Sequence, residues 1–220
     1  MSLLCLLAAE PELRVGMVAG EEWLTPTEQS RLQSLGTRAR RDTFLAGRWL
    51  ARRAVQRWLG VDRLPALEVA DSGASRVAGF RGVYVSISHS GCAVACAVCS
   101  VPVGVDVESL ARPRDHRALA EIVHTAVQRE QLAALPADAR LHAFLQLWTM
   151  KEAWLKARER GLDFALMRSL VLVDDVPGDV AVATVGDLVL AVAGHPGLAP
   201  HIEGPVNAVW RHGQMRVEAA

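Results

Sequence analysis

The order of helical and β patterns constrains the fold of this chain more than any other feature. An apolar N-terminal run predicts a first strand, and a helical region follows over residues 21–60. Three apolar β runs come next, at 83–88, 93–98 and 103–107. Helical patterns then occupy 116–134 and 139–160, and short β runs return after residue 165. The chain passes twice from strands through helices to strands, which indicates an α+β fold of two similar halves.

Composition limits the kinds of protein that this chain can be. With 220 residues, of which 51% are hydrophobic and 22% charged, it can bury a sizeable core as one large domain or two small ones. Lys+Arg and Asp+Glu are both 24, so there is no overall field to attract an anion. Any anion site must therefore come from local clustering. The overall charge argues neither for nor against a nucleic-acid partner, and none is expected.

The N-terminus and the cysteines favour a cytoplasmic protein. The first apolar run is short, lacks a basic segment before it and soon meets Glu10 and Glu12, so it predicts a strand and not a signal peptide. No run reaches the roughly 18 apolar residues of a membrane span. Cys92, Cys96 and Cys99 have a spacing used by iron–sulfur enzymes, but only Ala and Val separate them. We expect a buried strand there, with Cys92 and Cys96 on one face and Cys99 on the other.

Two carboxylates lie at the end of the third β run of this central region. In Gly104-Val105-Asp106-Val107-Glu108, the acids are two residues apart and point to one face of a strand. Burying both costs several kcal/mol unless a cation compensates, and Mg²⁺ prefers carboxylates, waters and substrate phosphates. Taken alone, the pattern is more typical of an edge strand with a solvated face.

A second group lies in the helical stretch WTMKEAWLK, residues 148–156. Glu152 and Lys156 are four residues apart and share one helix face. Alone, this is a common surface pair worth about 0.2–0.5 kcal/mol. If this helix lay beside a metal, Glu152 would supply a third carboxylate, and Lys156, one turn later, would suit a phosphate.

The third group is SISHSG, residues 86–91, where a strand is expected to end in a turn at His89. Hydroxyls, backbone N–H groups and an imidazole suit an anion such as phosphate, although a plain polar turn is the commoner outcome. A Ser-His nucleophile is disfavoured because adjacent residues rarely orient for proton transfer and there is no G-x-S-x-G elbow.

A basic helix over residues 38–59 is the fourth group. Arg48 and Arg52 lie four residues apart on one face, and the planar guanidinium fork binds phosphate well. The alternative is a solvated face beside an apolar stripe. The helix carries seven arginines: Arg38, Arg40, Arg41, Arg48, Arg52, Arg53 and Arg57.

SISHS, GVDVE and WTMKEAWLK, in that order and at this spacing, resemble the surfactin-type 4′-phosphopantetheinyl transferases. The resemblance is strong over residues 85–156. It implies a pseudo-dimer of two α+β halves, here 1–102 and 103–220, with coenzyme A in the cleft between them. The chain departs from the family over residues 71–76, where many members have a Gly-Lys-Pro turn near the adenine; here Gly73 would keep the turn and Arg76 would supply the charge.

The resemblance also implies roles for individual residues. Asp106, Glu108 and Glu152 would bind Mg²⁺, with Glu152 also accepting a proton and Lys156 at the pyrophosphate. His89 would contact the 3′-phosphate of coenzyme A, with Ser88 near it. The remaining coenzyme A contacts would come from Arg48, Arg52, Arg40 or Arg41, and from Lys151.

The implied reaction moves the phosphopantetheine arm of coenzyme A to a serine of an apo acyl or peptidyl carrier protein and releases 3′,5′-ADP. Fatty-acid, polyketide and nonribosomal-peptide carriers all fit, and the two-half length suggests a monomer. The alternatives are another Mg²⁺-dependent phosphoryl or nucleotidyl transferase, and a non-catalytic paralogue that binds carrier protein.

Overall fold

The structure is a computed structural model that describes residues 2–17, 20–70, 72–174, 176, 178–194, 201–205 and 208–218. Its helices are α1 (Glu10–Val15), α2 (Pro26–Ser34), α3 (Arg38–Leu59), α4 (His116–Val123), α5 (Ala126–Ala134), α6 (Ala137–Ala157) and α7 (Phe164–Ser169). Its strands are β1 (Ser2–Ala9), β2 (Leu67–Val69), β3 (Ser75–Val77), β4 (Tyr84–Ser90), β5 (Ala93–Cys99), β6 (Gly104–Ser109), β7 (Leu170–Asp174), β8 (Val180–Val185), β9 (Leu188–Ala193), β10 (His201–Glu203) and β11 (Arg211–Val217).

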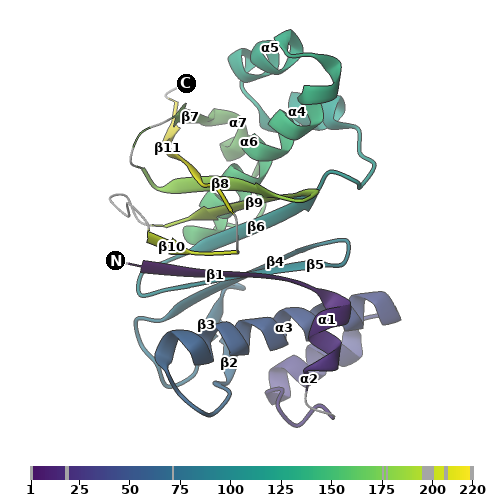
Figure 1. The fold of residues 1–220 in the computed structure, drawn as a ribbon, viewed down its shortest axis with the longest axis vertical. Helices are drawn as coiled ribbons and strands as arrows, with labels where there is room; N and C mark the ends of the chain where they lie inside the picture. The colour runs from purple at the N-terminus through teal and green to yellow at the C-terminus, as the bar shows by residue number, and fades with distance from the viewer. Residues whose placement is uncertain are drawn as a thin grey trace.

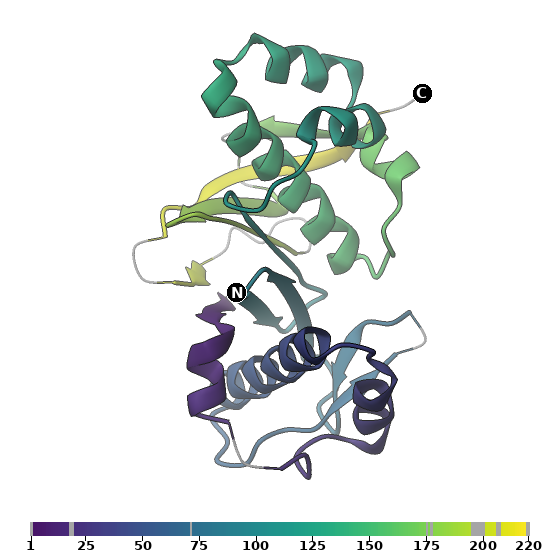
Figure 2. The same ribbon diagram turned by 90° about the vertical axis from the view of Figure 1, so that its right-hand side faces the viewer.

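Two sheets lie face to face between two long helices (Figure 1). The first sheet has the strand order β10-β1-β5-β4-β3-β2, and the second has the order β6-β9-β8-β11-β7. One apolar cluster fills the space between α3 and the first sheet, a second lies between the sheets, and a third lies between the second sheet and α6. The expected α+β fold of two helix-and-sheet halves is confirmed, and Figure 2 shows the halves stacked end to end.

Strand β5 explains why the central apolar run shows no polar alternation. Val94, Cys96 and Val98 pack toward α3, whereas Ala95, Ala97 and Cys99 pack toward the second sheet. Because both faces of the strand are covered, all seven of its residues are buried. Cys96 and Cys99 therefore lie on opposite faces, as predicted.

The cysteine prediction is wrong for Cys92, which is exposed in the turn that precedes β5. The turn itself also differs from the prediction, because β4 runs on through His89 and Ser90. A two-residue loop, Gly91-Cys92, then joins Ser90 to its partner Ala93. Gly91 has φ +59°, the left-handed conformation that so short a hairpin loop requires.

Helix caps divide the helical region that the sequence predicts over residues 21–60. Thr25 and Glu28 form a capping box at the start of α2, and Thr37 accepts a hydrogen bond from the Arg40 N–H at the start of α3. Gly60 ends α3 at φ +65°. Helices α1 and α7 and strand β3 were not expected, because segments of three to six residues carry too little periodicity.

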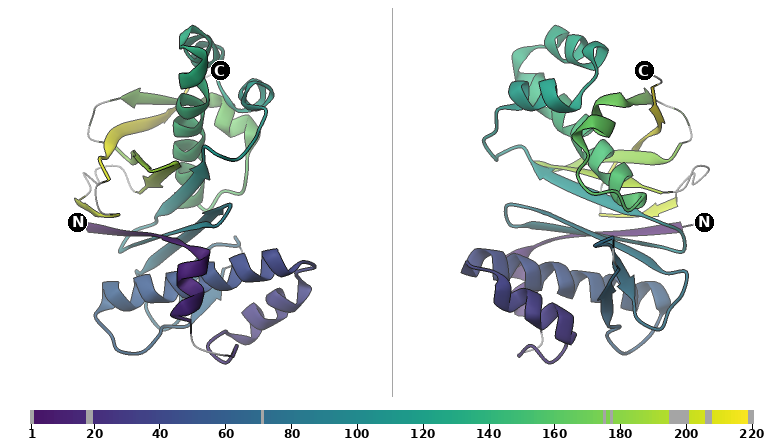
Figure 3. Two further views of the ribbon diagram at one scale, coloured as in Figure 1. Left: turned by 45° about the vertical axis from the view of Figure 1, so that its right-hand side comes forward. Right: turned by 180° about the vertical axis from the view of Figure 1, so that it is seen from behind.

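The C-terminal segment returns to the first half. Strand β10 pairs in parallel with β1, so a strand from near the C-terminus completes the sheet of the N-terminal half. Figure 3 shows β10 alongside β1 from both sides of the molecule. The division into residues 1–102 and 103–220 stays a prediction. Among the described residues, no helix is long and apolar enough to cross a membrane.

Gly104 sets how closely β6 approaches α6. A Cβ at this position would overlap the Ala153 carbonyl oxygen and would lie 2.6 Å from the Ala157 backbone nitrogen. The strand that carries Asp106 is therefore packed directly on the helix that carries Glu152 and Lys156.

We expect Gly104→Ala to lower the free energy of unfolding by about 1–3 kcal/mol or more, because the helix backbone cannot yield as a side chain can. Urea denaturation measures this change. Gly36→Ala is the matched control, since a Cβ there meets nothing within 4 Å, and it should shift stability by no more than about 0.5 kcal/mol. An equal effect of the two substitutions would contradict the close approach of β6 to α6.

Candidate active site

A pocket of about 660 Å³ lies between the two halves. Its walls come from α2 and α3, from the loop around Gly73, from β4, and from the end of α6 with the residues that follow it. Four of the predicted site residues line it: Arg40, Arg48, His89 and Lys156. Residues that are far apart in sequence thus place positive charge on one concavity.

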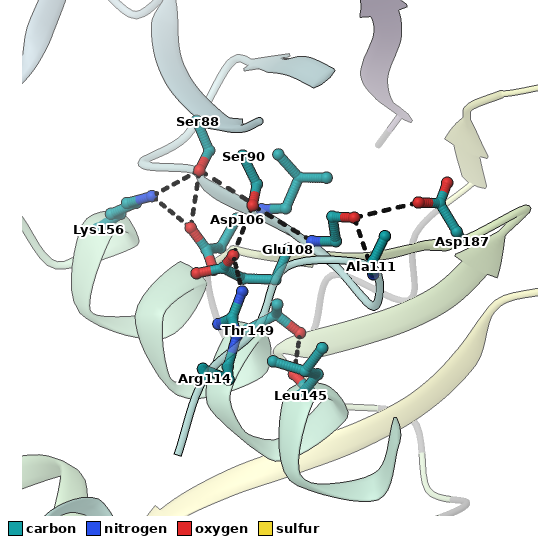
Figure 4. Close-up of polar contacts among 12 residues, drawn as sticks. Ser88, Ser90, Asp106, Glu108, Ala111, Arg114, Leu145, Thr149, Lys156 and Asp187 are labelled. Atoms are coloured by element: carbon teal, nitrogen blue, oxygen red, sulfur yellow. Dashed lines mark hydrogen bonds and ion pairs between the residues drawn. The ribbon is translucent and has the colours of Figure 1, made fainter. Parts of the chain in front are cut away.

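Next to this pocket, the serines of β4 contact the edge of β6 (Figure 4). The side chains of Ser86, Ser88 and Ser90 point to the same face of β4, because residues two apart on a strand share a face. Their hydroxyls accept hydrogen bonds from backbone N–H groups 19 residues later in the chain, those of Val105 (3.1 Å), Val107 (3.4 Å) and Ser109 (3.2 Å). We call these three contacts the serine ladder. It satisfies N–H groups on the edge strand of the second sheet.

Asp106 is buried beside the ladder and is neutralised by Lys156. The Lys156 ammonium lies 2.7 Å from Asp106 Oδ1, and the Ser88 hydroxyl donates to the same oxygen at 2.7 Å. Burial raises the pKa of Asp106 above its ordinary value, although the nearby Lys156 acts in the opposite direction. Within the described part of the chain, Asp106 Oδ2 is buried without a hydrogen-bond partner.

Glu108 repeats this arrangement one strand step further on. Ser90 donates to Glu108 Oε2 at 2.6 Å, and Arg114 Nη2 lies 2.7 Å from the same oxygen. Arg114 comes from the segment between β6 and α4, and its side chain is largely buried. Both carboxylates of β6 therefore have a serine and a cation on one oxygen.

Glu152 completes an acidic group with the two carboxylates of β6. Burial raises its pKa to about 7, and the charges of Asp106 and Glu108 act in the same direction. The three predicted metal ligands are thus close enough to interact electrostatically. Among the described residues, however, no group of three His, Cys, Asp or Glu side chains is arranged to hold a metal ion.

Arg48 holds the wall of the pocket that α3 provides. It donates to the Ser75 hydroxyl at 2.7 Å and lies 3.6 Å from Glu28 Oε1, and its guanidinium stacks over the Phe44 ring. His89 is exposed on the same concavity, and Arg40 is exposed at the start of α3. Arg40, Arg48 and His89 thus line the same pocket, and their contact with a phosphate stays a prediction.

The structure does not bring Arg52 to the pocket. Its side chain is 1% exposed and forms a paired contact with both carboxylate oxygens of Glu28, while its guanidinium lies over the Trp23 ring. This buried pair joins α3 to α2. The four-residue spacing predicted that Arg48 and Arg52 would share a phosphate-binding face. Arg52 is instead paired with the Glu28 carboxylate of α2.

Lys151 is also absent from the pocket. It is fully buried, and its ammonium lies within hydrogen-bonding distance of the carbonyl oxygens of Val123 (2.8 Å) and Met167 (2.7 Å), of Gln128 Oε1 (2.8 Å) and of His124 Nδ1 (3.1 Å). Burial lowers the pKa of Lys151 to about 7, and burial together with the Lys151 charge lowers that of His124 to about 3. Lys151 therefore fastens α6 to the ends of α4 and α7 and does not face a ligand.

Ser88 sits behind the pocket wall. A hydroxyl has one donor and two acceptor positions. Ser88 donates to Asp106 and accepts from the Val107 N–H and from Lys156 Nζ at 3.2 Å, so all three positions are occupied. The predicted contact of Ser88 with coenzyme A would require one of these bonds to break.

Sequence reasoning missed the partners that hold these residues in place. Arg114 carries no motif, and the capping-box position of Glu28 does not indicate its pair with Arg52, so only the tertiary structure identifies these partners. A further contact joins the halves at the pocket rim, where Glu159 accepts a hydrogen bond from Ser72 at 2.7 Å and pairs with Arg76. The sequence does distinguish the two lysines from the other basic residues, because Lys151 and Lys156 are the only lysines of the chain, beside 22 arginines.

Comparisons with known proteins identify the family of this chain. Residues 28–99 match the model of the 4′-phosphopantetheinyl transferase N-terminal domain, and residues 102–189 match that of the 4′-phosphopantetheinyl transferase superfamily. Together the two matches cover most of the chain. The chain belongs to the 4′-phosphopantetheinyl transferase superfamily.

Individual relatives match shorter stretches. The 4′-phosphopantetheinyl transferase psf-1 of Bacillus pumilus is 37% identical over 83 residues, which is 38% of this chain and 35% of the relative. AcpT of Salmonella typhi is 33% identical over 121 residues, 54% of this chain and 59% of the relative. Sfp of Bacillus subtilis (strain 168) is 34% identical over 83 residues, 38% and 36%. The matches thus span between about a third and three fifths of the relatives' lengths.

We expect Lys151→Met to lower the free energy of unfolding by about 2–5 kcal/mol, because it strips several buried acceptors of their donor. Urea denaturation measures the change. Arg168→Met removes an exposed positive charge from α7 and should change stability by no more than about 0.5 kcal/mol. Equal stabilities for the two variants would show that Lys151 is not the fastener of α6.

Proposed function

We propose that this protein transfers the 4′-phosphopantetheine arm of coenzyme A to a serine of an apo acyl or peptidyl carrier protein. The observation that carries the proposal is the pocket between the halves, which sets four cationic or imidazole side chains beside a buried acidic group. Coenzyme A carries phosphates at two separated positions. A pocket of about 660 Å³ has the size of ordinary small-molecule sites.

The positive side chains that line the pocket suit the two phosphate positions of coenzyme A. Arg40, Arg48 and His89 would bind the 3′-phosphate. Lys156 comes from α6, where it pairs with Asp106, and would bind the pyrophosphate. Binding at the remote phosphate would orient the reacting one, which is how binding energy is converted into rate.

The acidic group fits a divalent cation in its chemistry. Oxygen ligands suit Mg²⁺, and the buried unpartnered Oδ2 of Asp106 is an atom that a cation would satisfy. Asp106, Glu108 and Glu152 are the residues that would hold the ion. When bound, Mg²⁺ supplies charge stabilisation for the phosphoryl group being transferred.

Two residues of α6 would act on the reaction directly. Burial and the neighbouring acids raise the pKa of Glu152, which makes its carboxylate a stronger proton acceptor, so Glu152 would accept the proton of the attacking serine. Lys156 would offset negative charge on the leaving phosphate. The serine oxygen forms its bond to the β-phosphorus of coenzyme A as the bond from that phosphorus to the bridging oxygen breaks, and 3′,5′-ADP leaves.

Purified protein with coenzyme A, Mg²⁺ and an apo carrier protein should add the mass of one phosphopantetheine arm to the carrier, as measured by intact-protein mass spectrometry. Glu152→Gln and Asp106→Asn keep the side-chain shape and should each reduce the loading rate by about 100-fold or more. Glu121→Gln, which only breaks an exposed pair with Arg129, is the control and should keep the wild-type rate.

Failure to load any of a panel of fatty-acid, polyketide and nonribosomal-peptide carriers would reject the proposed transferase activity. Loading by Glu152→Gln at the wild-type rate would leave the activity standing and remove Glu152 from the reaction.

The two lysines allow the coenzyme A position to be tested without turnover. Lys156 has a side chain that is 30% exposed and Lys151 is fully buried, so an amine-acetylating reagent should modify Lys156 and spare Lys151 in the folded protein. Coenzyme A with its thiol blocked as a methyl thioether should slow acetylation of Lys156 by about tenfold, as quantified by peptide mass spectrometry.

Adenosine monophosphate at the same concentration lacks the pyrophosphate and the pantetheine arm and should protect less. Unchanged acetylation of Lys156 at saturating coenzyme A thioether would place the ligand elsewhere.

A further inference from the structure

The serine ladder does two things at once. Each hydroxyl accepts from an N–H of β6, and this alone would join the sheets. Ser88 and Ser90 also donate, to Asp106 and Glu108 respectively, whereas the ladder contact of Ser86 is with the backbone of Val105. The three serines therefore share one backbone role, but only Ser88 and Ser90 also hold a carboxylate (Figure 4).

The way in which the carboxylates are held is the same at both positions. Ser88 and Lys156 both contact Oδ1 of Asp106, and Oδ2 is left buried and without a partner in the described part of the chain. Ser90 and Arg114 both contact Oε2 of Glu108, which leaves Oε1 outside these contacts. One oxygen of each carboxylate is thus fixed by a hydroxyl and a cation, and the other is spared.

We infer that Ser88 and Ser90 are positioning residues, which fix one oxygen of Asp106 and of Glu108 so that the other is presented to a divalent cation. This inference rests on the proposed function, because it concerns the same acidic group. It gives the serines a task different from binding coenzyme A. Hydrogen bonds from outer residues to carboxylate ligands commonly set metal affinity in this way.

Ser86 provides the internal control for a purely structural role. If the ladder served only to satisfy the edge of β6, removing any of the three hydroxyls would have the same consequence: one unsatisfied backbone N–H. If Ser88 and Ser90 also position the carboxylates, their removal must change cation binding as well, and removal of the Ser86 hydroxyl must not.

The experiment compares Ser86→Ala, Ser88→Ala and Ser90→Ala in the full chain with coenzyme A present. Mn²⁺ serves as the probe for the divalent cation, and electron paramagnetic resonance of free Mn²⁺ gives the dissociation constant. Titration of the same coenzyme A without protein is subtracted. Thermal unfolding reports the stability of every variant, and we expect larger losses for Ser88→Ala and Ser90→Ala, because these substitutions also remove a hydrogen bond to a carboxylate.

We expect Ser88→Ala and Ser90→Ala to raise the Mn²⁺ dissociation constant by about 10–100-fold, and Ser86→Ala to change it by no more than about threefold. Equal Mn²⁺ affinity in all three variants, with the wild-type protein binding Mn²⁺ and loading carrier, would overturn the inference and leave the proposed function intact. A wild-type protein that binds no Mn²⁺ and loads carrier without divalent cations would overturn the metal site and the inference together. Should Ser88→Ala fail to fold, the comparison of Ser90→Ala with Ser86→Ala decides alone.

Discussion

Hydrogen bonds from the β4 serines to the edge of β6 join the two halves where the acidic group lies. An edge strand has unpaired backbone groups, and placing it against another sheet requires partners for them. Ser86, Ser88 and Ser90 supply these partners at a constant offset of 19 residues. Side chains of the first sheet thereby take the place of the backbone partners that a further strand beside β6 would have provided. The register of β6, and with it the position of Asp106 and Glu108, depends on this contact.

Charge compensation decides which acids can be buried near this contact. Asp106 is paired with Lys156, Glu108 with Arg114 and Glu28 with Arg52. Glu152 has the strongly raised pKa because burial and the other acids act together on it. The acidic group is therefore balanced incompletely by the protein itself. That imbalance is the physical reason for expecting a cation there.

The two lysines show how a motif combines different tasks. In a chain that otherwise uses arginine for every basic side chain, Lys151 and Lys156 stand five residues apart on α6. Five residues correspond to a rotation of roughly 140° around a helix, so the two point to different faces. Lys151 enters a closed site where a compact ammonium meets several acceptors, and Lys156 reaches the pocket.

The sequence by itself determined the α+β class and the principal strands and helices, because periodicity is a local property of the chain. The i, i+2 spacing placed Asp106 and Glu108 on one face of a strand, but only the resemblance to a known family joined Glu152 to them. Short elements such as α7 were missed because a few residues hold too little pattern. Only the tertiary structure decided which basic residues face the pocket. Arg48 and Arg52 share a helix face, yet Glu28 from α2 captures Arg52, while Arg48 remains on the pocket wall. Likewise, Ser88 is held by Asp106 and Lys156 and not left free for a ligand. The partner of a buried polar group comes from wherever packing brings a complementary atom, and one-dimensional spacing does not contain that information.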